Sequence, residues 1–521
     1  MTETIGIAEF RALYAGRAEF AVIDPREELV FSRGHLFGAT NLPLSRLELR
    51  LGDTIPRRDT LVVLCDDGGD EAEAAARLLA GFGHGRLRIL AGGISAWQLA
   101  GGAVFRGIHV PSKTFGELVE QRLRTPSITA AELEARQRAG ADLLLLDARP
   151  LDEHRAYCVP GATACPSTEM IHRAAGLRDR EVVVHCGGRT RAIIGAQTLI
   201  DSGLFGSVRA LENGTPGWQF AGFAVERGNG AELARPAAPA AAGLAAAARL
   251  RRAWGVPDLD APGLRHWLAG AGTRYLIDIR SASEFVETRL PGARHVPGGE
   301  LLQATEAHLA VQNAGVALVD SDGIRAVTCA VWLRRMGWAE VVTHSLAPGA
   351  PGQERGAPPD PVPPADRITV ADAAAAQARG ALLCDIRPSP QYRRGHAAGA
   401  AWLNRGRLGR DLGPVGAAVP LVLIADDPAY AALLLRDLRA LGRNVRVLHG
   451  GIEAWRAAGL AVEAGLGRLL SAPVDSYLDP DHFDEPAVHA RENRAYIDWE
   501  IALPGQIGDE PAVRFRLDPP G

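Results

Sequence analysis

The stretch LLLLDARPLDEHRAYCVPGATACP, residues 143–166, decides the fold. Its four leucines form an apolar strand that ends in Asp147, and Arg149 follows two residues later. A polar stretch with helical character comes next, and a Gly-Ala turn leads into a second short strand. A strand, a helix and another strand in this order predict a parallel sheet covered by helices.

The same pattern occurs three more times in the 521 residues: FAVIDPREELVFSRGHLFGATNLP from residue 20, RYLIDIRSASEFVETRLPGARHVP from residue 274, and ALLCDIRPSPQYRRGHAAGAAWLN from residue 381. The anchor aspartates are Asp24, Asp147, Asp278 and Asp385. Repeats with this period, about a hundred residues, predict tandem domains rather than a solenoid. We place domain 1 at residues 1–106, domain 2 at 126–227, domain 3 at 256–345 and domain 4 at 366–465, with a C-terminal tail at 466–521.

Each domain continues with a second apolar strand followed by a helical pattern: TLVVLC, EVVVHC, VALVD and LVLIA. Domains 1, 2 and 4 then carry a Gly-x-x-x-Trp signature that ends at Trp97, Trp218 and Trp455. Near-continuous Val and Leu indicate strands buried on both faces. The predicted fold class is therefore α/β, with four tandem domains that each hold a mostly parallel sheet flanked by helices. Because all four domains keep Asp-x-Arg, we expect this pair to be structural, as an ion pair or a helix cap.

The candidate site is the loop in VVVHCGGRTRAII, residues 182–194, where domain 2 places Cys186 between a strand and a helix. Ligands of such sheets bind beyond the carboxyl ends of strands. The N–H groups and dipole at a helix N-terminus favour a thiolate, so we expect a nucleophilic Cys186. Glycines let the backbone wrap the sulfur, arginines can bind an anion, and a hydroxyl can donate: Gly187, Gly188, Arg189, Thr190 and Arg191 are the candidate substrate-binding residues.

These features together resemble rhodanese domains, and the resemblance covers nearly the whole chain. In that family the loop runs from a nucleophilic cysteine to an arginine five positions later, which Cys186 and Arg191 match. Ala192 replaces the Ser or Thr that often follows. The resemblance implies a sulfurtransferase that takes sulfane sulfur from a donor such as thiosulfate onto Cys186. A thiol or cyanide then accepts it, and no metal or cofactor is needed.

The other three domains hold different residues in the same slot. Cys65 of domain 1 stands among acids that should raise its pKa and repel anions, so we expect a degenerate loop, with a second sulfur-accepting thiol as the alternative. Asp320 and Ala425 replace the nucleophile in domains 3 and 4, which we expect to be inactive and free to serve in packing, dimerisation or docking of a protein partner. Cys158 and Cys165 are expected to fill space, with a resolving thiol as the alternative.

Two other functions stay open. A sulfur carrier or scaffold would receive the persulfide from a partner and dock it on the inactive domains. A cysteine-dependent phosphatase or arsenate reductase would use the His-Cys start of the loop, but its longer loop needs an arginine at position 192, which is Ala192.

The composition excludes several classes of protein. The formal net charge is −4 and aromatic residues make up 6%, which argues against a nucleic-acid partner. No apolar run reaches the roughly 18 residues that span a bilayer, so we expect no membrane interaction. Six cysteines without regular spacing form neither a disulfide framework nor a zinc cluster, and we expect a reducing, cytoplasmic location.

Overall fold

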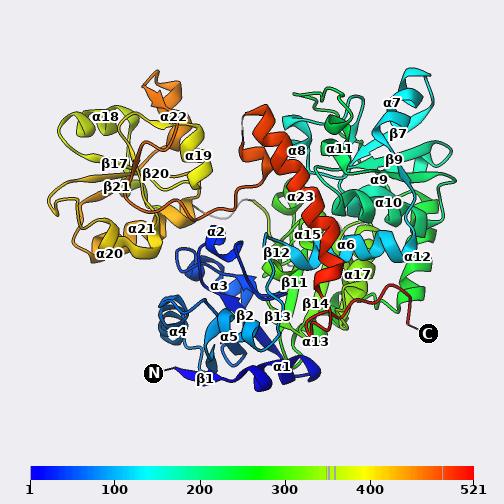
Figure 1. The fold of residues 1–521 in the computed structure, drawn as a ribbon, viewed down its shortest axis with the longest axis horizontal. Helices are drawn as coiled ribbons and strands as arrows, with labels where there is room; N and C mark the ends of the chain where they lie inside the picture. The colour runs from blue at the N-terminus through cyan, green and yellow to red at the C-terminus, as the bar shows by residue number, and fades with distance from the viewer. Residues whose placement is uncertain (1, 348, 350–352, 357–359, 484, 521) are drawn as a thin grey trace.

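The computed structural model describes residues 2–347, 349, 353–356, 360–483 and 485–520. Figure 1 shows four α/β units, with domain 1 in blue, domain 2 in cyan to green, domain 3 in green between them, and domain 4 in yellow and orange to one side. The predicted fold class is confirmed, because each unit contains a mostly parallel sheet flanked by helices. None of the helices in the described ranges is both long and apolar enough to cross a membrane.

The sheets of domains 1 and 2 share one strand order. In domain 1 it is β1 (Glu3–Ile5), β5 (Leu87–Leu90), β4 (Leu61–Leu64) and β2 (Phe20–Asp24), with β3 (Thr40–Asn41) also on β2. In domain 2 it is β6 (Ser127–Ile128), β10 (Val208–Leu211), β9 (Glu181–His185), β7 (Leu143–Asp147) and β8 (Thr163–Ala164). The helices of domain 1 are α1 (Ile7–Ala15), α2 (Glu28–Phe31), α3 (Leu47–Thr54), α4 (Glu71–Gly81) and α5 (Gly93–Leu99). Those of domain 2 are α7 (Ala130–Arg138), α8 (Leu151–Ala156), α9 (Met170–Ala174), α10 (Thr190–Ser202) and α11 (Gly214–Phe220).

Domains 3 and 4 repeat the plan with variations. The sheet of domain 3 runs β12 (Arg294–His295), β11 (Arg274–Asp278), β14 (Gly315–Asp320) and β15 (Val341–Ser345). That of domain 4 runs β16 (Arg367–Ile368), β21 (Val445–Leu448), β20 (Leu421–Ile424), β17 (Leu382–Asp385), β19 (Ala401–Trp402) and β23 (Arg468–Leu469), with a separate hairpin of β18 (His396–Ala397) and β22 (Val462–Glu463). The helices of domain 3 are α13 (Ala261–Leu268), α14 (Ala282–Glu287), α15 (Gly298–Gln303), α16 (Thr305–His308) and α17 (Arg325–Arg335). Those of domain 4 are α18 (Val370–Ala378), α19 (Ser389–Arg394), α20 (Leu408–Asp411), α21 (Pro428–Ala440) and α22 (Gly451–Ala457).

One strand crosses between domains. β13 (Val311–Gln312) lies in the sequence of domain 3 but pairs antiparallel with β2 of domain 1. It is the one described strand of that sheet that is not parallel to its neighbour. Domains 1 and 3 therefore share a sheet, an arrangement that a repeat of self-contained domains did not predict.

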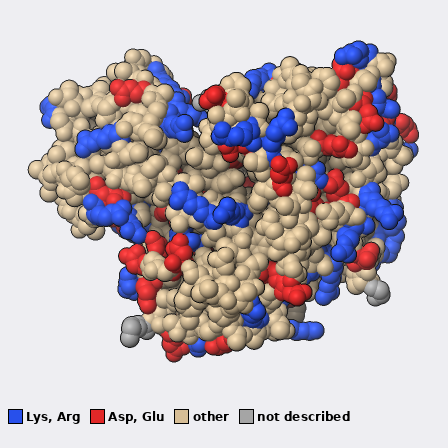
Figure 2. Space-filling view, in the orientation of Figure 1, with Lys and Arg blue, Asp and Glu red and all other residues tan. Residues whose placement is uncertain are grey.

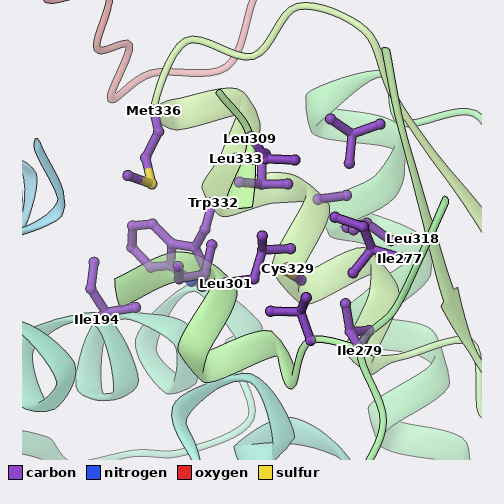
Figure 3. Close-up of a cluster of buried hydrophobic side chains, with 14 of the residues drawn as sticks. Ile194, Ile277, Ile279, Leu301, Leu309, Leu318, Cys329, Trp332, Leu333 and Met336 are labelled. Atoms are coloured by element: carbon purple, nitrogen blue, oxygen red, sulfur yellow. The ribbon is translucent and has the colours of Figure 1, made fainter. Parts of the chain in front are cut away.

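The packing divides the chain into a three-domain body and domain 4. One hydrophobic cluster continues through domains 1, 2 and 3, whereas domain 4 has clusters of its own. Figure 3 shows part of the shared cluster, where Trp332 of α17 lies near Ile194 of α10, and the indole of Trp332 donates to the hydroxyl of Thr198 at 2.8 Å. Domain 4 contacts domain 1 through ion pairs of Arg405 and Arg436 with Glu48. A notch separates domain 4 from the body on the face in Figure 2, where acidic and basic side chains are interspersed.

Three helices lie outside the repeats. The Ala-rich linker between domains 2 and 3 forms α12 (Ala241–Trp254), and α6 (Val110–Leu123) forms in the linker before domain 2. The tail segment ENRAYIDWEIAL, residues 492–503, lies in α23 (Pro486–Gln506), which packs on α6 and α11 and crosses the body in red in Figure 1. Parts of the linker between domains 3 and 4 (348, 350–352, 357–359) lie outside the described residues.

The Asp-x-Arg pair forms the same buried clasp in all four domains. The arginine binds the aspartate two residues earlier at 2.5 to 2.7 Å, and the same guanidinium donates to a backbone carbonyl eight residues further on. The clasp therefore ties the end of the first strand to the end of the short helix after it. The predicted structural role is confirmed: these aspartates are fully buried and the arginines nearly so.

We predict that breaking the clasp destabilises the protein even in a domain that lacks a nucleophile. Arg280→Ala leaves Asp278 buried without its cation, which typically costs about 3–5 kcal/mol. Chemical denaturation of the two proteins checks this. The control is Arg57→Ala, because Arg57 pairs with Asp59 on the surface, and it should leave the transition unchanged. Equal effects of the two substitutions would contradict the prediction.

Candidate active site

The Cys186 loop occupies the predicted place at the carboxyl end of β9 and the start of α10. Cys186 is 2% exposed, and its Sγ accepts a hydrogen bond from the N–H of Gly188 at 3.4 Å. The carbonyl of Cys186 accepts from both the N–H and the hydroxyl of Thr215, at 2.8 and 3.0 Å. The turn before α11 thus binds the loop through its backbone carbonyl, while the N–H groups of the loop point at the sulfur.

That turn explains the Gly-x-x-x-Trp signature. Gly214 has φ +54°, and a Cβ at this position would lie 2.3 Å from the carbonyl oxygen of Gly188 and 2.4 Å from that of Cys186. Gly93 and Gly451 pack closely against the backbone of the corresponding loops in domains 1 and 4. The indole N–H of Trp218 donates to the carbonyl of Ala224 at 2.9 Å and fixes the end of α11. The signature is therefore a support for the loop.

We predict that Gly214→Ala lowers the activity of Cys186 by about 100-fold, because a displacement of about 1 Å in the reacting groups can have this effect. Thiosulfate-dependent turnover and labelling of Cys186 measure it. Gly222→Ala is the matched control: Gly222 also has positive φ, at +85°, but its Cβ would meet nothing within 4 Å. If both variants lost the same activity, left-handed strain alone would be the cause.

The two loop arginines are already bound by carboxylates. Arg191 forms a bidentate ion pair with Glu153, with both N–O distances at 2.8 Å. Arg189 pairs with Glu117 and Glu120 of α6 and donates to the side chain of Asn213 at 2.8 Å. Anion binding by these arginines stays a prediction, and an anion would have to share Arg191 with Glu153 or displace it.

The remaining loop residues differ in accessibility. Gly187 and Gly188 line the cavity above the sulfur, and a Cβ on Gly188 would lie 3.3 Å from a carboxylate oxygen of Glu500 of α23, a tight contact. Thr190 is buried against Gly116 of α6, and its hydroxyl has no hydrogen-bond partner within the described part of the chain. Thr190 lines the cavity, and donation by its hydroxyl to a substrate stays a prediction.

Burial shifts the pKa of the Cys186 thiol. Removal from water raises the pKa of Cys186, and the carboxylate of Glu500 raises it further, while Arg191 and the N–H groups of Gly188 and Ala192 lower it. The net direction is upward, opposite to the thiolate-favouring loop that the sequence suggested. The neutral thiol is therefore the resting form near neutral pH, and a substrate that shifts Glu500 or frees Arg191 would favour the thiolate.

We predict that alkylation of Cys186 by iodoacetamide is slow at pH 7 and accelerates only above the ordinary thiol pKa of about 8.5. The sign follows because the thiolate reacts and forms as pH rises through the raised pKa. Peptide mass spectrometry measures the rate for Cys186 alone. Glu500→Gln should move the profile to lower pH and Arg191→Met to higher pH. A wild-type midpoint below 8 would refute the prediction.

The cavity at Cys186 has a volume of about 310 Å³ and is built by several parts of the chain. Domain 2 contributes the loop and Glu153, α6 contributes Lys113, and α15 of domain 3 contributes Gln303. The tail closes it with Tyr477, with residues 479–481, and with Tyr496 and Glu500 of α23. Sequence reasoning missed Lys113, Tyr496 and Glu500; the one available signal was a glutamate on the apolar face of ENRAYIDWEIAL.

Comparison with known proteins agrees with this geometry. The family of rhodanese-like domains matches the chain at residues 7–100, 129–221, 261–345 and 369–458. The chain belongs to the rhodanese family. The crystal structure of thiosulfate sulfurtransferase from Pseudomonas aeruginosa has a TM-score of 0.88 and 38% sequence identity, covering 99% of this chain and 100% of that one. The HTH-type transcriptional regulator Rv0324 from Mycobacterium tuberculosis (strain ATCC 25618 / H37Rv) is 35% identical over 103 residues, 20% of this chain and 45% of the regulator, so the match spans less than half of that relative.

The corresponding loops of domains 1 and 3 make buried contacts within their own domains. Cys65 is fully buried in the core of domain 1; burial first and Asp24 next raise the pKa of its thiol, with Asp66 adding to them. The carboxylate of Asp66 accepts from the N–H groups of Gly68 and Ala72, so it organises the start of α4. In domain 3, Asp320 accepts from two loop N–H groups and from a serine hydroxyl.

Domain 3 preserves the loop arginine without a nucleophile. Arg325 forms ion pairs with Glu284 at 2.8 and 2.9 Å, the counterpart of the Arg191–Glu153 pair in domain 2. This pair is therefore part of the rhodanese fold in both domains and not a mark of the active one alone. Among the other thiols, four are fully buried in hydrophobic clusters and none lines the Cys186 cavity, namely Cys158, Cys165, Cys329 and Cys384.

Proposed function

We propose that the protein, a sulfurtransferase of the rhodanese family, moves sulfane sulfur from a donor such as thiosulfate to a thiol or cyanide through a persulfide on Cys186. The observation that carries the proposal is the Cys186 sulfur at the floor of a cavity, facing backbone N–H groups at the start of a helix. The full-length likeness to a thiosulfate sulfurtransferase and the four rhodanese-like domains support this class of chemistry.

In the first half-reaction the thiolate of Cys186 attacks the outer sulfur of thiosulfate. A new S–S bond forms on Cys186, the bond from the outer sulfur to the sulfonate sulfur breaks, and its electron pair leaves with sulfite. The proton of the resting thiol passes to solvent. Gly188 and Ala192 direct their N–H groups at the sulfur, which favours the negative charge that the persulfide carries.

In the second half-reaction an acceptor attacks the outer sulfur of the persulfide. A thiolate leaves as a new persulfide and cyanide leaves as thiocyanate, and in either case the Cys186 thiolate is released. This is a ping-pong scheme with one covalent intermediate. The donor and the acceptor use the same cavity in turn, and its 310 Å³ suits small molecules.

Domain 3 and the linker helix α6 help to build the site, and the other rhodanese domains do not react. Domain 3 supplies the wall at Gln303 and shares the core with domain 2, and α6 holds Arg189 through Glu117. We assign domains 1, 3 and 4 a structural role, since Cys65 is enclosed in the core and neither Asp320 nor Ala425 can form a persulfide.

We predict that incubation with thiosulfate adds one sulfur to the Cys186 peptide and that cyanide removes it as thiocyanate. Intact and peptide mass spectrometry detect both steps. Cys186→Ser should lose the added sulfur and the turnover, and Cys65→Ser should keep both, because Cys65 is fully buried in the core of domain 1. Retention of activity in Cys186→Ser would refute the site.

The same measurement separates an enzyme from a carrier. An enzyme transfers sulfur from thiosulfate to cyanide over many turnovers with no other protein present. A carrier would hold the persulfide on Cys186 but turn over little with small donors. A phosphatase would hydrolyse a phosphate ester and take up no sulfur.

A further inference from the structure

Glu500 is a buried carboxylate at the Cys186 cavity that the proposed sulfur transfer does not use. It lies on the second-last turn of α23, is 1% exposed, and lines the cavity together with Cys186. Its Oε1 accepts from Nζ of Lys113 at 3.0 Å and from the hydroxyl of Tyr496 at 3.2 Å. Its Oε2 has no hydrogen-bond partner among the residues that the structure describes.

The unpaired oxygen faces the loop that carries the nucleophile. A Cβ built on Gly188 would lie 3.3 Å from Glu500 Oε2, and the N–H of the same glycine donates to the sulfur of Cys186. A buried carboxylate oxygen without a donor is costly, and such a position is normally filled by a donor from a ligand or water. The structure therefore presents an acceptor of hydrogen bonds a short distance from the reacting sulfur.

The charged side chains around the cavity favour a hydrogen-bond donor that carries a positive charge. Four described carboxylates line the cavity against three cations, and each of those cations is paired. The carboxylate of Asp481 is itself engaged by the hydroxyl of Tyr157, at 2.8 and 2.9 Å. Glu500 is thus the buried carboxylate of this lining with an oxygen left for an incoming cation, whereas Asp479 is half-exposed, and Glu500 would repel an anionic group placed there.

We propose that Glu500 binds the ammonium group of a small aminothiol and so makes such thiols the preferred acceptors of the Cys186 sulfur. This inference rests on the proposed persulfide. The ammonium group donates to Oε2 while the deprotonated sulfur of the acceptor attacks the outer sulfur of the persulfide. A new S–S bond forms on the acceptor, the S–S bond to Cys186 breaks, and Cys186 takes the electron pair and then the proton that the acceptor thiol lost.

The test is a single-turnover discharge of the persulfide by three thiols of similar length. Full-length protein is loaded with thiosulfate, freed of donor, and mixed with cysteamine, 2-mercaptoethanol or 3-mercaptopropionate. The comparison of wild type with Glu500→Gln for each thiol cancels the differences in thiol acidity. We expect Glu500→Gln to slow cysteamine about 10-fold, as for a lost hydrogen bond between charged groups. These changes are taken relative to 2-mercaptoethanol, whose rate carries any shared effect of the variant on the Cys186 thiol, and on that scale 3-mercaptopropionate should become faster.

Two further variants separate binding from folding. Asp498→Asn removes an exposed carboxylate from the same helix and should change none of the three rates. Glu500→Asp keeps the charge and should retain part of the preference for cysteamine. Loading of Glu500→Gln by thiosulfate, at least as fast as in wild type because a like charge is gone, shows that its site is intact.

The outcomes are distinct. If wild type takes up no sulfur, the proposed function fails. If it is loaded but Glu500→Gln slows all three thiols equally, Glu500 is structural and the inference is wrong. If the cysteamine rate of wild type does not fall as ionic strength increases, the attraction is not electrostatic and the inference is also wrong.

Discussion

A buried ion pair between an aspartate and an arginine, two residues apart, is the constraint on which each domain depends. Asp147 ends β7 of domain 2, and Arg149 spans from this carboxylate to the carbonyl of Tyr157. Desolvation makes such a pair a weak source of net stability, but removing one partner leaves a buried charge. The pair therefore specifies where the chain turns. The pair is also present in domains without a nucleophile. The residues that the fold requires are therefore different from those that the chemistry requires.

The repeat, the fold class and the nucleophile loop could all be predicted from the sequence because their signals are local. Asp147 and Arg149 are neighbours in the chain, and Cys186 stands next to the glycines that shape its loop. The partners of the loop arginines were harder to see. Glu153 lies six residues after Asp147 and Glu284 six after Asp278, so the recurring spacing was in the sequence, but only the structure gives it meaning as an ion pair with Arg191 and Arg325.

The contacts that could not be predicted join residues that are far apart in the chain. Lys113 and Glu500 are separated by 387 residues, and β13 leaves its own domain for the edge of β2. Periodicity identifies a buried face of a helix but not what covers it. The direction of the Cys186 pKa was mispredicted for the same reason: the loop alone favours a thiolate, whereas the burial that opposes it comes in part from α6 and α23.

The placement of α23 has a consequence for how the protein is made. A ribosome releases the Cys186 loop some 300 residues before it releases Glu500, and domains form as units in that order. During this interval domain 2 can complete its sheet, yet the thiol has no cover from α23. The nascent enzyme therefore holds an open cysteine that the finished one encloses. Oxidative damage at Cys186 should then depend on the rate of translation as well as on the oxidant.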